Sequence, residues 1–512
     1  MIAVSMILGM TLFYVAFITY TVLVIGVGFW SSRKASRSDE EYFLAGRSLG
    51  PWVASLSASA SSESGWVTLG LVGFAFADGV AAYWILPGCL LGFLFNWFVL
   101  AGKLRESSGQ LGAVTIPDYL AIRFRERLPI IRLMSVVVIL IAMMLYCAAQ
   151  FAAAGKAFHA SFDGMEYQWG VLLGAGIVLV YVTLGGFRAA CWTDFLQGLL
   201  MVGVLVIFPI WLLMNGTGID AIHAGLAKGG EELVTFWPKL TGPALFGFLI
   251  GSGALGVNFG YPGQPHVLVR FMALRDRREA FIGGIISFVW GFLVLSGAVT
   301  IGLIARAFAE EGAPWAQEML DTSGGGEYAL LATARALVSP MLGGLILAAV
   351  LSAICSTADS QLVVASSAAA NDVYARLIDK RRRLSHAIVN RVTILLMGVV
   401  AVLLVIDQEV NVYQYVLEYG WAILGASFGP QVILAAFWNR ATAAGCIAGM
   451  AAGFLTALFW KLYFSEQTGI YNLPLAFVVA IVLNVVVSLL TKAPEQPHGA
   501  PSSAKGVSSG HV

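Results

Sequence analysis

The sequence contains little charge. Charged residues make up 12% of its 512 residues, whereas 59% are hydrophobic and the mean hydropathy is +0.82. That charged fraction is about half of what a soluble globular chain carries. A soluble enzyme and an intrinsically disordered protein are therefore excluded. The 30 Lys and Arg residues are balanced by 29 Asp and Glu residues, so no net field would attract a nucleic acid.

Cysteine is also scarce. There are five cysteines, with no CxxC motif and no pairing with histidine at metal-ligand spacing. All of them stand in apolar segments, at Cys89, Cys147, Cys191, Cys355 and Cys446. We expect them to be buried as small hydrophobic side chains, not to form disulfides or bind a metal.

Long apolar runs dominate the rest. A helix needs about 20 apolar residues to cross a bilayer, and thirteen stretches are long enough or nearly so. They lie within 8–30, 51–77, 80–102, 130–153, 168–187, 191–214, 244–266, 281–305, 338–368, 388–406, 411–437, 441–462 and 471–491. The first is too long for a signal peptide and has no A-x-A cleavage site, so it is predicted to be a retained span. The sequence predicts an all-α membrane protein with 13 transmembrane helices.

The basic residues predict the orientation. Most Lys and Arg residues fall in alternate connections, including Arg270 after the seventh span, whereas the loop 307–328 on the other side is acidic. Because basic loops stay cytoplasmic, the N-terminus is predicted outside and the C-terminus inside the cell inner (plasma) membrane. The predicted organisation is a first helix and cytoplasmic loop (1–50), a transporter core (51–406), three C-terminal helices (407–491) and a disordered Pro/Ser/Gly-rich cytoplasmic tail (492–512).

Two spans contain clusters of small residues and proline. The second reads ASLSASASSESGWVTLGLVG, and the seventh reads GSGALGVNFGYPGQPH. Such clusters imply non-helical backbone that is buried in protein or lines a cavity. The two spans are five apart, which is typical of an inverted repeat of two five-helix units that each open with a broken helix. The alternative is that the small residues only let helices pack closely.

The ninth span adds hydroxyl groups. In LAAVLSAICSTADSQLVVASS, Ala353, Ser356 and Thr357 stand at i, i+3 and i+4 and share one helical face. Together with carbonyls released at Ala60 and Glu63, they would form an oxygen cage of the kind that a hard cation such as sodium prefers. The alternative is that the hydroxyls bond only carbonyls of their own helix.

Ionisable residues at membrane depth are costly and are candidates for function. Glu63 and Asp359 are the deepest, Asp194 lies near the cytoplasmic end of the sixth span, and Glu418 lies in the eleventh. For Asp194 the alternative is that a helix dipole stabilises the acid. For Glu418 the alternative is that it lies close enough to the membrane interface to be solvated. No nucleophile stands with a base, since His266 and the other span-flanking histidines are predicted at membrane edges, so no enzyme is expected.

Seven motifs identify a family. The chain resembles the sodium/solute symporter family, and it is most similar to the sodium/proline symporters. The resemblance covers residues 10–490 and rests on YFLAGRSLGPWVASLSA, SGWVTLGL, TIPDYLAIRF, TLGGFRAACWTDFLQGLLM, GYPGQPHVLVRFMA, STADSQLVVASSA and FGPQVILAAFWNR. It implies a LeuT-like fold in which spans 2, 3, 7 and 8 rock against the other helices. It also implies import of a small organic solute, an amino acid such as proline or a related carboxylate, with sodium as the coupling ion and the lipid bilayer as surroundings.

The resemblance also implies site residues. Sodium would be held by backbone oxygens of Ala60, Glu63 and Ala353 and by the hydroxyls of Ser356 and Thr357, and Asp194 would help sodium leave toward the cytoplasm. The solute pocket would include Ser64, Gly65, Tyr146, Tyr261 and Pro265.

This chain departs from the proline symporters at two positions. Their motif ASDMSGW is ASSESGW here, so Ser62 replaces the aspartate and the acid moves to Glu63. A carboxylate near the cation site, at Glu63 or at Asp359, could take up a proton, so proton coupling is the alternative to sodium coupling. Val257 stands where those symporters have a tryptophan, which would leave room for a larger solute. A further alternative is a transporter-like nutrient sensor that acts with a separate kinase.

Overall fold

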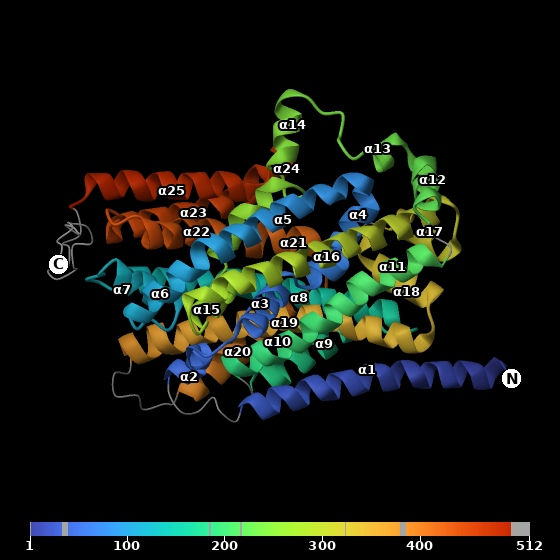
Figure 1. Ribbon diagram of the computed structural model, residues 1–512, viewed down its shortest axis with the longest axis horizontal. Coiled ribbons are helices and arrows are strands. Elements are labelled where there is room, and N and C mark those ends of the chain that lie inside the picture. Colours follow the sequence, from blue (N-terminus) through green and yellow to red (C-terminus); the bar gives the residue numbers. More distant parts are fainter. Residues whose placement is uncertain are drawn as a thin grey trace, which may run out of the picture.

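The computed structural model describes residues 2–32, 39–183, 186–215, 218–322, 324–378 and 386–492. Its regular structure is helical apart from one β-bridge between Leu49 and Leu274. The long helices run side by side along the long axis (Figure 1). Helix α1 (Ile2–Ser32) begins at the end of the long axis where α17 (Pro314–Asp321) also lies, and α25 (Asn472–Leu490) ends at the other. We call these the N-terminal end and the C-terminal end of the bundle.

Within the described residues, nine helices are long and apolar enough to cross a membrane, and Tyr167–Val180 and Ala387–Leu403 are shorter apolar helices. The predicted all-α membrane fold is confirmed, whereas the count of 13 spans stays a prediction. The five cysteines are all buried, as expected. The predicted disordered tail lies, apart from its first residue, outside the described residues.

The first half of the chain supplies helices for the predicted spans one to six. After α1 these are α3 (Pro51–Ser62), η2 (Trp66–Leu71), α4 (Val72–Asp78), η3 (Gly79–Trp84), α5 (Ile85–Leu94), η4 (Phe95–Ala101), α6 (Gly102–Gln110), α8 (Ile130–Ser161), α9 (Tyr167–Val182), α10 (Phe187–Val202), η5 (Gly203–Ile207) and α11 (Phe208–Met214). The short connecting helices are α2 (Asp39–Leu44), η1 (Ala45–Arg47), α7 (Ile116–Arg123), α12 (Ile219–Gly229) and α13 (Glu231–Val234).

The second half continues the pattern. Its helices in the predicted spans are α14 (Gly242–Leu249), η6 (Leu255–Gly263), α15 (Pro265–Met272), α16 (Arg277–Glu310), α19 (Pro340–Ser367), η8 (Ala368–Ile378), α20 (His386–Leu403), α21 (Val412–Tyr415), η9 (Val416–Trp421), α22 (Ala422–Phe437), α23 (Ala443–Tyr463) and α25. The connecting helices are α17, η7 (Gly325–Tyr328), α18 (Ala329–Leu337) and α24 (Ser465–Thr468).

The predicted break in the second span is confirmed. Helix α3 ends at Ser62, and Glu63 adopts the non-helical angles φ −99° and ψ 62°. Directly after it, the Ser64 hydroxyl accepts the backbone N–H of Trp66 at 3.1 Å. Such side-chain bonds compete with helical hydrogen bonds, which explains why the serine-rich sequence interrupts the helix here.

The predicted break in the seventh span is also confirmed. Helix α14 ends at Leu249, the 3-10 helix η6 carries Pro262, and a new helix, α15, begins at Pro265. Proline lacks a backbone N–H and has a fixed φ, so it interrupts a helix in the interior but fits the first turn of a new one. The two broken segments together bring irregular backbone to the middle of the bundle.

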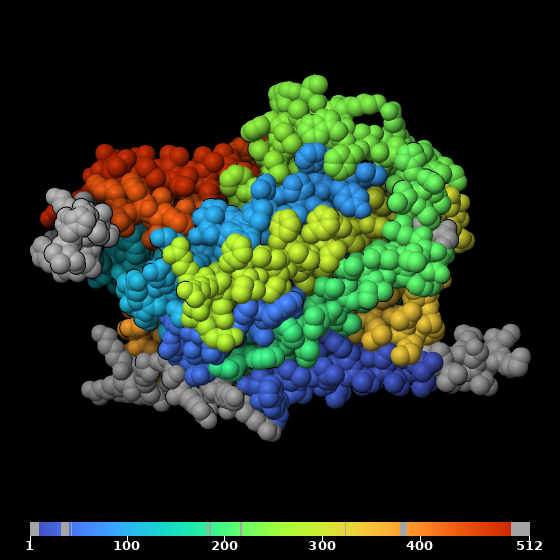
Figure 2. All heavy atoms as spheres, in the orientation of Figure 1, coloured from blue at the N-terminus to red at the C-terminus, as the bar shows by residue number. Residues whose placement is uncertain are grey.

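Helix α1 lies along one edge of the molecule, and α23 and α25 lie at the opposite edge (Figures 1 and 2). Large apolar side chains of α1, such as Ile18, Val22 and Trp30, are exposed. Exposed apolar surface of this extent on a long helix is what contact with lipid requires.

Glycines bring η6 and α22 into backbone contact. A Cβ atom added at Gly263 would lie 2.6 Å from the Cα of Gly425, and one added at Gly425 would lie 2.7 Å from the Cα of Gly260. These distances are shorter than any real contact of a Cβ atom. Only glycine therefore fits where these two segments meet.

Candidate functional site

Oxygen atoms of two helices meet where α3 ends. The last carbonyls of a helix have no N–H partner within it. Here the Ser356 hydroxyl donates to the carbonyl of Ala60 at 2.9 Å and to that of Ala353 at 3.1 Å, and the Thr357 hydroxyl donates to the carbonyl of Ser61 at 3.0 Å. We call these five residues the oxygen cluster. It lies at the negative end of the α3 dipole, which favours a cation.

Four of the five predicted cage residues are therefore brought together. The hydroxyls of Ser356 and Thr357 cross to the unwound end of α3, so they do more than bond their own helix. The carbonyl of Ser61 was not predicted, although it follows Ala60 directly. Glu63, the fifth predicted residue, is the non-helical residue that follows α3.

The carboxylate of Glu63 joins the two broken segments. It is fully buried, and its Oε1 accepts the hydroxyl of Tyr261 at 2.8 Å and that of Ser62 at 3.3 Å. Its Oε2 has no hydrogen-bond partner among the described residues. A buried carboxylate oxygen without a partner is strongly unfavourable. The site is thus suited to a ligand that brings a positively charged donor.

Side chains of α8 surround the same break. The backbone N–H of Gly65 donates to Oε1 of Gln150 at 3.0 Å, and Ser64 is fully buried. One turn earlier on α8, the ring of Tyr146 packs edge-on against His266, with centroids 6.0 Å apart. The predicted pocket residues Ser64, Gly65 and Tyr146 thus share one environment. Gln150 was missed, although a glutamine one turn after Tyr146 in an apolar run was a signal.

The other predicted pocket residues lie on either side of this group. The ring of Tyr261 packs against Phe93 and Trp421, with centroids 5.1 and 4.7 Å away. The carbonyl of Val257 accepts the indole N–H of Trp421 at 3.0 Å, and its side chain is buried. Val257 is therefore part of the packing behind Tyr261. Pro265 lies elsewhere, in the wall of a cavity at the C-terminal end of the bundle.

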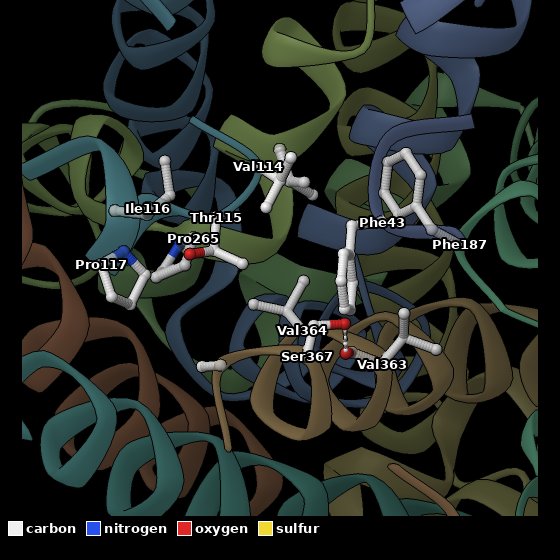
Figure 3. A pocket seen from close by; sticks show the side chains of 12 residues that line it. Phe43, Val114, Thr115, Ile116, Pro117, Phe187, Pro265, Val363, Val364 and Ser367 are labelled. Carbon is white, nitrogen blue, oxygen red and sulfur yellow. Dashed lines mark hydrogen bonds between the residues drawn. The ribbon is translucent and has the colours of Figure 1, made fainter. Parts of the chain in front are cut away.

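That small cavity measures about 20 Å³, which is room for roughly one water molecule. Figure 3 shows Phe43 and Phe187 on one side, Pro117 on the other, and Val363 and Ser367 beneath them. At the N-terminal end, a larger cavity of about 500 Å³ is lined by Phe74, Tyr413 and neighbouring residues.

The larger cavity has an aromatic floor held by a buried ion pair. The ring of Tyr413 stacks on Phe74 and Trp66, at 4.7 and 5.8 Å. Its backbone N–H donates to Glu327 at 3.0 Å, and Glu327 pairs with Lys156 at 2.7 Å. Burial raises the pKa of Glu327, and the ammonium of Lys156 opposes that shift. The floor is thus built in part from η2 and α4, the two segments that follow the break in the second span.

Two predictions about charged side chains are wrong. Arg270 is not in a cytoplasmic loop, because α15 continues through it and its guanidinium is fully buried against Asp194, at 2.9 Å. His266 is not at a membrane edge but fully buried in the core. The signal was the helical continuation PHVLVRFM, which puts these two residues four apart on one face.

The remaining acids also have defined surroundings. Asp359 is buried beside Gly28 and Thr193, and its Oδ1 accepts the hydroxyl of Ser360 at 3.0 Å. It therefore lies on the side of α19 that faces α1 and α10. Glu418 pairs with Lys461 at 2.5 Å. Neither carboxylate joins the oxygen cluster.

Comparisons with known proteins agree with this architecture. The model of the sodium:solute symporter family matches residues 42–453. The chain belongs to this family. The symporter is 35% identical over 483 residues to the sodium/proline symporter of Escherichia coli (strain K12), covering 94% of this chain and 93% of the relative. It is 32% identical over 492 residues to the sodium/proline symporter of Staphylococcus aureus (strain JH9), with the same coverage.

A solved structure shares the fold. The substrate-bound outward-open state of a Na+-coupled sialic acid symporter matches with a TM-score of 0.75 at 19% identity, covering 95% of this chain and 98% of that one. The symporter is thus a secondary transporter and not an enzyme. It is a multi-pass protein of the plasma membrane that imports a small solute with sodium as the coupling ion.

Proposed function

We propose that this symporter imports a zwitterionic amino acid, such as proline, together with sodium. Two relatives named sodium/proline symporter cover nearly the whole chain, which supports the solute class. The observation that carries the proposal is the buried carboxylate of Glu63, whose Oε2 has no hydrogen-bond partner among the described residues. An ammonium group on the solute supplies both the donor and the opposite charge that this oxygen requires.

The solute binds between the broken helices. Ser64, Gly65, Tyr146 and Tyr261 contribute polar groups or rings. Val257 supports Tyr261 from behind, and Pro265, in the wall of the small cavity, stays a prediction from the sequence. The amide of Gln150 joins them, because its Nε2 is buried without a partner in the described part of the chain. In this arrangement Glu63 binds the ammonium, and the backbone at the start of η2 faces the carboxylate.

Sodium binds where the oxygen cluster adjoins Glu63, the residue that follows α3. The ligands are the backbone oxygens of Ala60, Glu63 and Ala353 and the hydroxyls of Ser356 and Thr357. The hydrogen bonds of Ser356 and Thr357 to the end of α3 support this assignment, because these oxygens already face one another across the two helices. The membrane potential supplies about 2.3 kcal/mol per sodium charge per 100 mV, which drives accumulation of a neutral zwitterion.

The N-terminal end of the bundle is extracellular and the C-terminal end is cytoplasmic. The concentration of basic residues in alternate connections supports this orientation. Residues 51–406 act as the inverted-repeat core, and residues 407–491 add a further layer of helices. Asp194 helps sodium leave the site toward the cytoplasmic end. Asp359, on the far side of α19, has no direct part in solute binding.

The test is uptake of labelled solutes into proteoliposomes. The panel contains proline, other neutral amino acids and matched carboxylates that lack the amino group, each with a sodium gradient or a proton gradient alone. We expect accumulation driven by sodium only, for solutes with an ammonium group only. Accumulation driven by protons alone, or equal uptake of carboxylates without an amino group, contradicts the proposal.

Variants assign the effect to Glu63. In Glu63→Gln the negative charge is lost, so the KM for the amino acid rises at least about tenfold, since a hydrogen bond to a charged group contributes about 1.5–3 kcal/mol. The matched control is Glu418→Gln. It also removes an acid from a membrane helix, but the carboxylate of Glu418 is already paired with Lys461. We expect its KM to stay close to that of the parent.

A further inference from the structure

A buried ion pair separates the oxygen cluster from the small cavity. Asp194 and Arg270 are both fully buried, with Nη2 and Oδ2 2.9 Å apart. On one side, Ser61 of the oxygen cluster donates its hydroxyl to Asp194 at 3.2 Å. On the other side, the ring of Phe187, which lines the small cavity in Figure 3, lies 5.1 Å from the guanidinium carbon.

The guanidinium of Arg270 connects four helices. It bonds Asp194 of α10, the Ser57 hydroxyl of α3 at 3.1 Å, the Ser360 hydroxyl of α19 and the carbonyl of His266 in its own helix α15. Ser360 stands one turn after Ser356 and Thr357 on α19. A charge removed from water is stable only when its donors are paired in this way. Opening a path through this point requires the guanidinium to leave Asp194.

Asp194 retains one free acceptor. Its Oδ2 binds Arg270 and the hydroxyls of Ser57 and Ser61, whereas its Oδ1 has no hydrogen-bond partner among the residues that the structure describes. A sodium ion that leaves the oxygen cluster toward the small cavity meets this carboxylate first. Sodium and the guanidinium are then two cations beside one carboxylate.

We propose that the Arg270 guanidinium is a tethered cation that closes the cytoplasmic exit of the sodium site. It holds the carboxylate of Asp194, and sodium leaves when it replaces the guanidinium there. After sodium has gone, the guanidinium returns and closes the path again. The structure has this gate closed, since the guanidinium lies 2.9 Å from the carboxylate and both side chains are fully buried. The proposal rests on the sodium site proposed above.

The test is the leak of radioactive sodium from proteoliposomes that contain the full chain and no solute. In Arg270→Gln the path lacks its closing cation, so we expect the leak to rise at least about tenfold over the parent, and the sodium/solute flux ratio to rise with it. In Arg270→Lys, which keeps a cation, the leak stays within about threefold of the parent.

A second comparison separates a gate from a loosened structure. In Asp194→Asn/Arg270→Gln the carboxylate that attracts sodium is also gone, so the leak falls below that of Arg270→Gln. A loosened helix packing would leave the leak unchanged or larger. The matched control is Arg306→Gln. Arg306 is also held by a carboxylate (Glu310, 2.7 Å) and a carbonyl, and it lies over a phenylalanine ring (Phe76, 5.4 Å). It lines the larger cavity at the opposite end of the bundle from the proposed gate.

Two results overturn the proposal. One is a sodium leak in Arg270→Gln equal to that of the parent. The other is a leak in Asp194→Asn/Arg270→Gln that is equal to or larger than the leak in Arg270→Gln. If Arg270→Gln does not fold, Ser360→Ala keeps both charges and removes one anchor of the guanidinium, so it must still leak more than the parent. Failure of the sodium site itself is distinguishable, because Ser356→Ala would then leave the sodium dependence of uptake unchanged.

Discussion

Removal of the Ser356 hydroxyl is the sharpest test of the sodium site. This hydroxyl donates to Ala60 at 2.9 Å and is one of the two side-chain ligands proposed for sodium. A hydrogen-bond or ligand contact to a charged group contributes about 1.5–3 kcal/mol. In Ser356→Ala, the sodium concentration that gives half-maximal uptake should therefore rise about 10- to 150-fold.

The same loss has a second consequence that can be measured without transport. Sodium at 100 times its Kd stabilises the parent by about 2.7 kcal/mol. With a Kd raised 10- to 150-fold, the same concentration stabilises Ser356→Ala by only about 1.4 to 0.3 kcal/mol. Thermal unfolding of the purified protein with and without sodium, at constant ionic strength with choline, measures this difference.

The control is Ser366→Ala on the same helix. Ser366 is also buried, and its hydroxyl donates at 3.0 Å to Val363 of its own helix. Its removal lowers stability by about 1 kcal/mol and leaves the sodium dependence unchanged. A half-maximal sodium concentration in Ser356→Ala within about twofold of the parent would refute the sodium site, provided that the variant still accumulates solute.

Three further outcomes are expected. Lys156→Met leaves the carboxylate of Glu327 buried without its counter-charge, so the free energy of unfolding should fall by about 3–5 kcal/mol. The double variant Lys156→Met/Glu327→Gln should recover most of this loss, and a Lys156→Met variant as stable as the parent contradicts the reasoning. Gly260→Ala puts a Cβ atom 1.9 Å from the indole nitrogen of Trp421, so initial uptake should fall at least about tenfold while the protein still reaches the membrane. Tyr261→Phe removes a 2.8 Å hydrogen bond to the buried carboxylate at the helix break, so the solute KM should rise about three- to tenfold with little change in the half-maximal sodium concentration.

The sequence was sufficient for features that depend on local chemistry. The serine run before Glu63 and the prolines of the seventh span weaken helical hydrogen bonding through their own local chemistry, so both breaks could be predicted. The spacing of Ser356 and Thr357 fixes which face of a helix they share. These signals do not depend on the rest of the fold.

Features that depend on the partner of a residue could not be predicted in this way. Arg270 follows the seventh span and resembles any basic residue of a cytoplasmic loop. Its burial depends on Asp194, 76 positions away in sequence, which supplies the counter-charge. Likewise, the carboxylate of Glu63 and the hydroxyl of Tyr261 meet only because two broken helices face one another. Pairing between distant segments is a property of the fold, and composition or spacing does not encode it.

The backbone contact between η6 and α22 has a consequence for motion. Where bulky side chains interdigitate, one helix can move past another only if rotamers change and the packing opens. Gly260 and Gly263 both meet the backbone of Gly425, and Gly260 also lies against the indole of Trp421. At the contact with Gly425, the broken helix meets backbone, so no rotamer there has to change before the two segments shift past each other. Because Gly260, Gly263 and Gly425 have no methyl group, this part of the contact has no interlocking side chains, which favours sliding of the seventh span over its separation from α22.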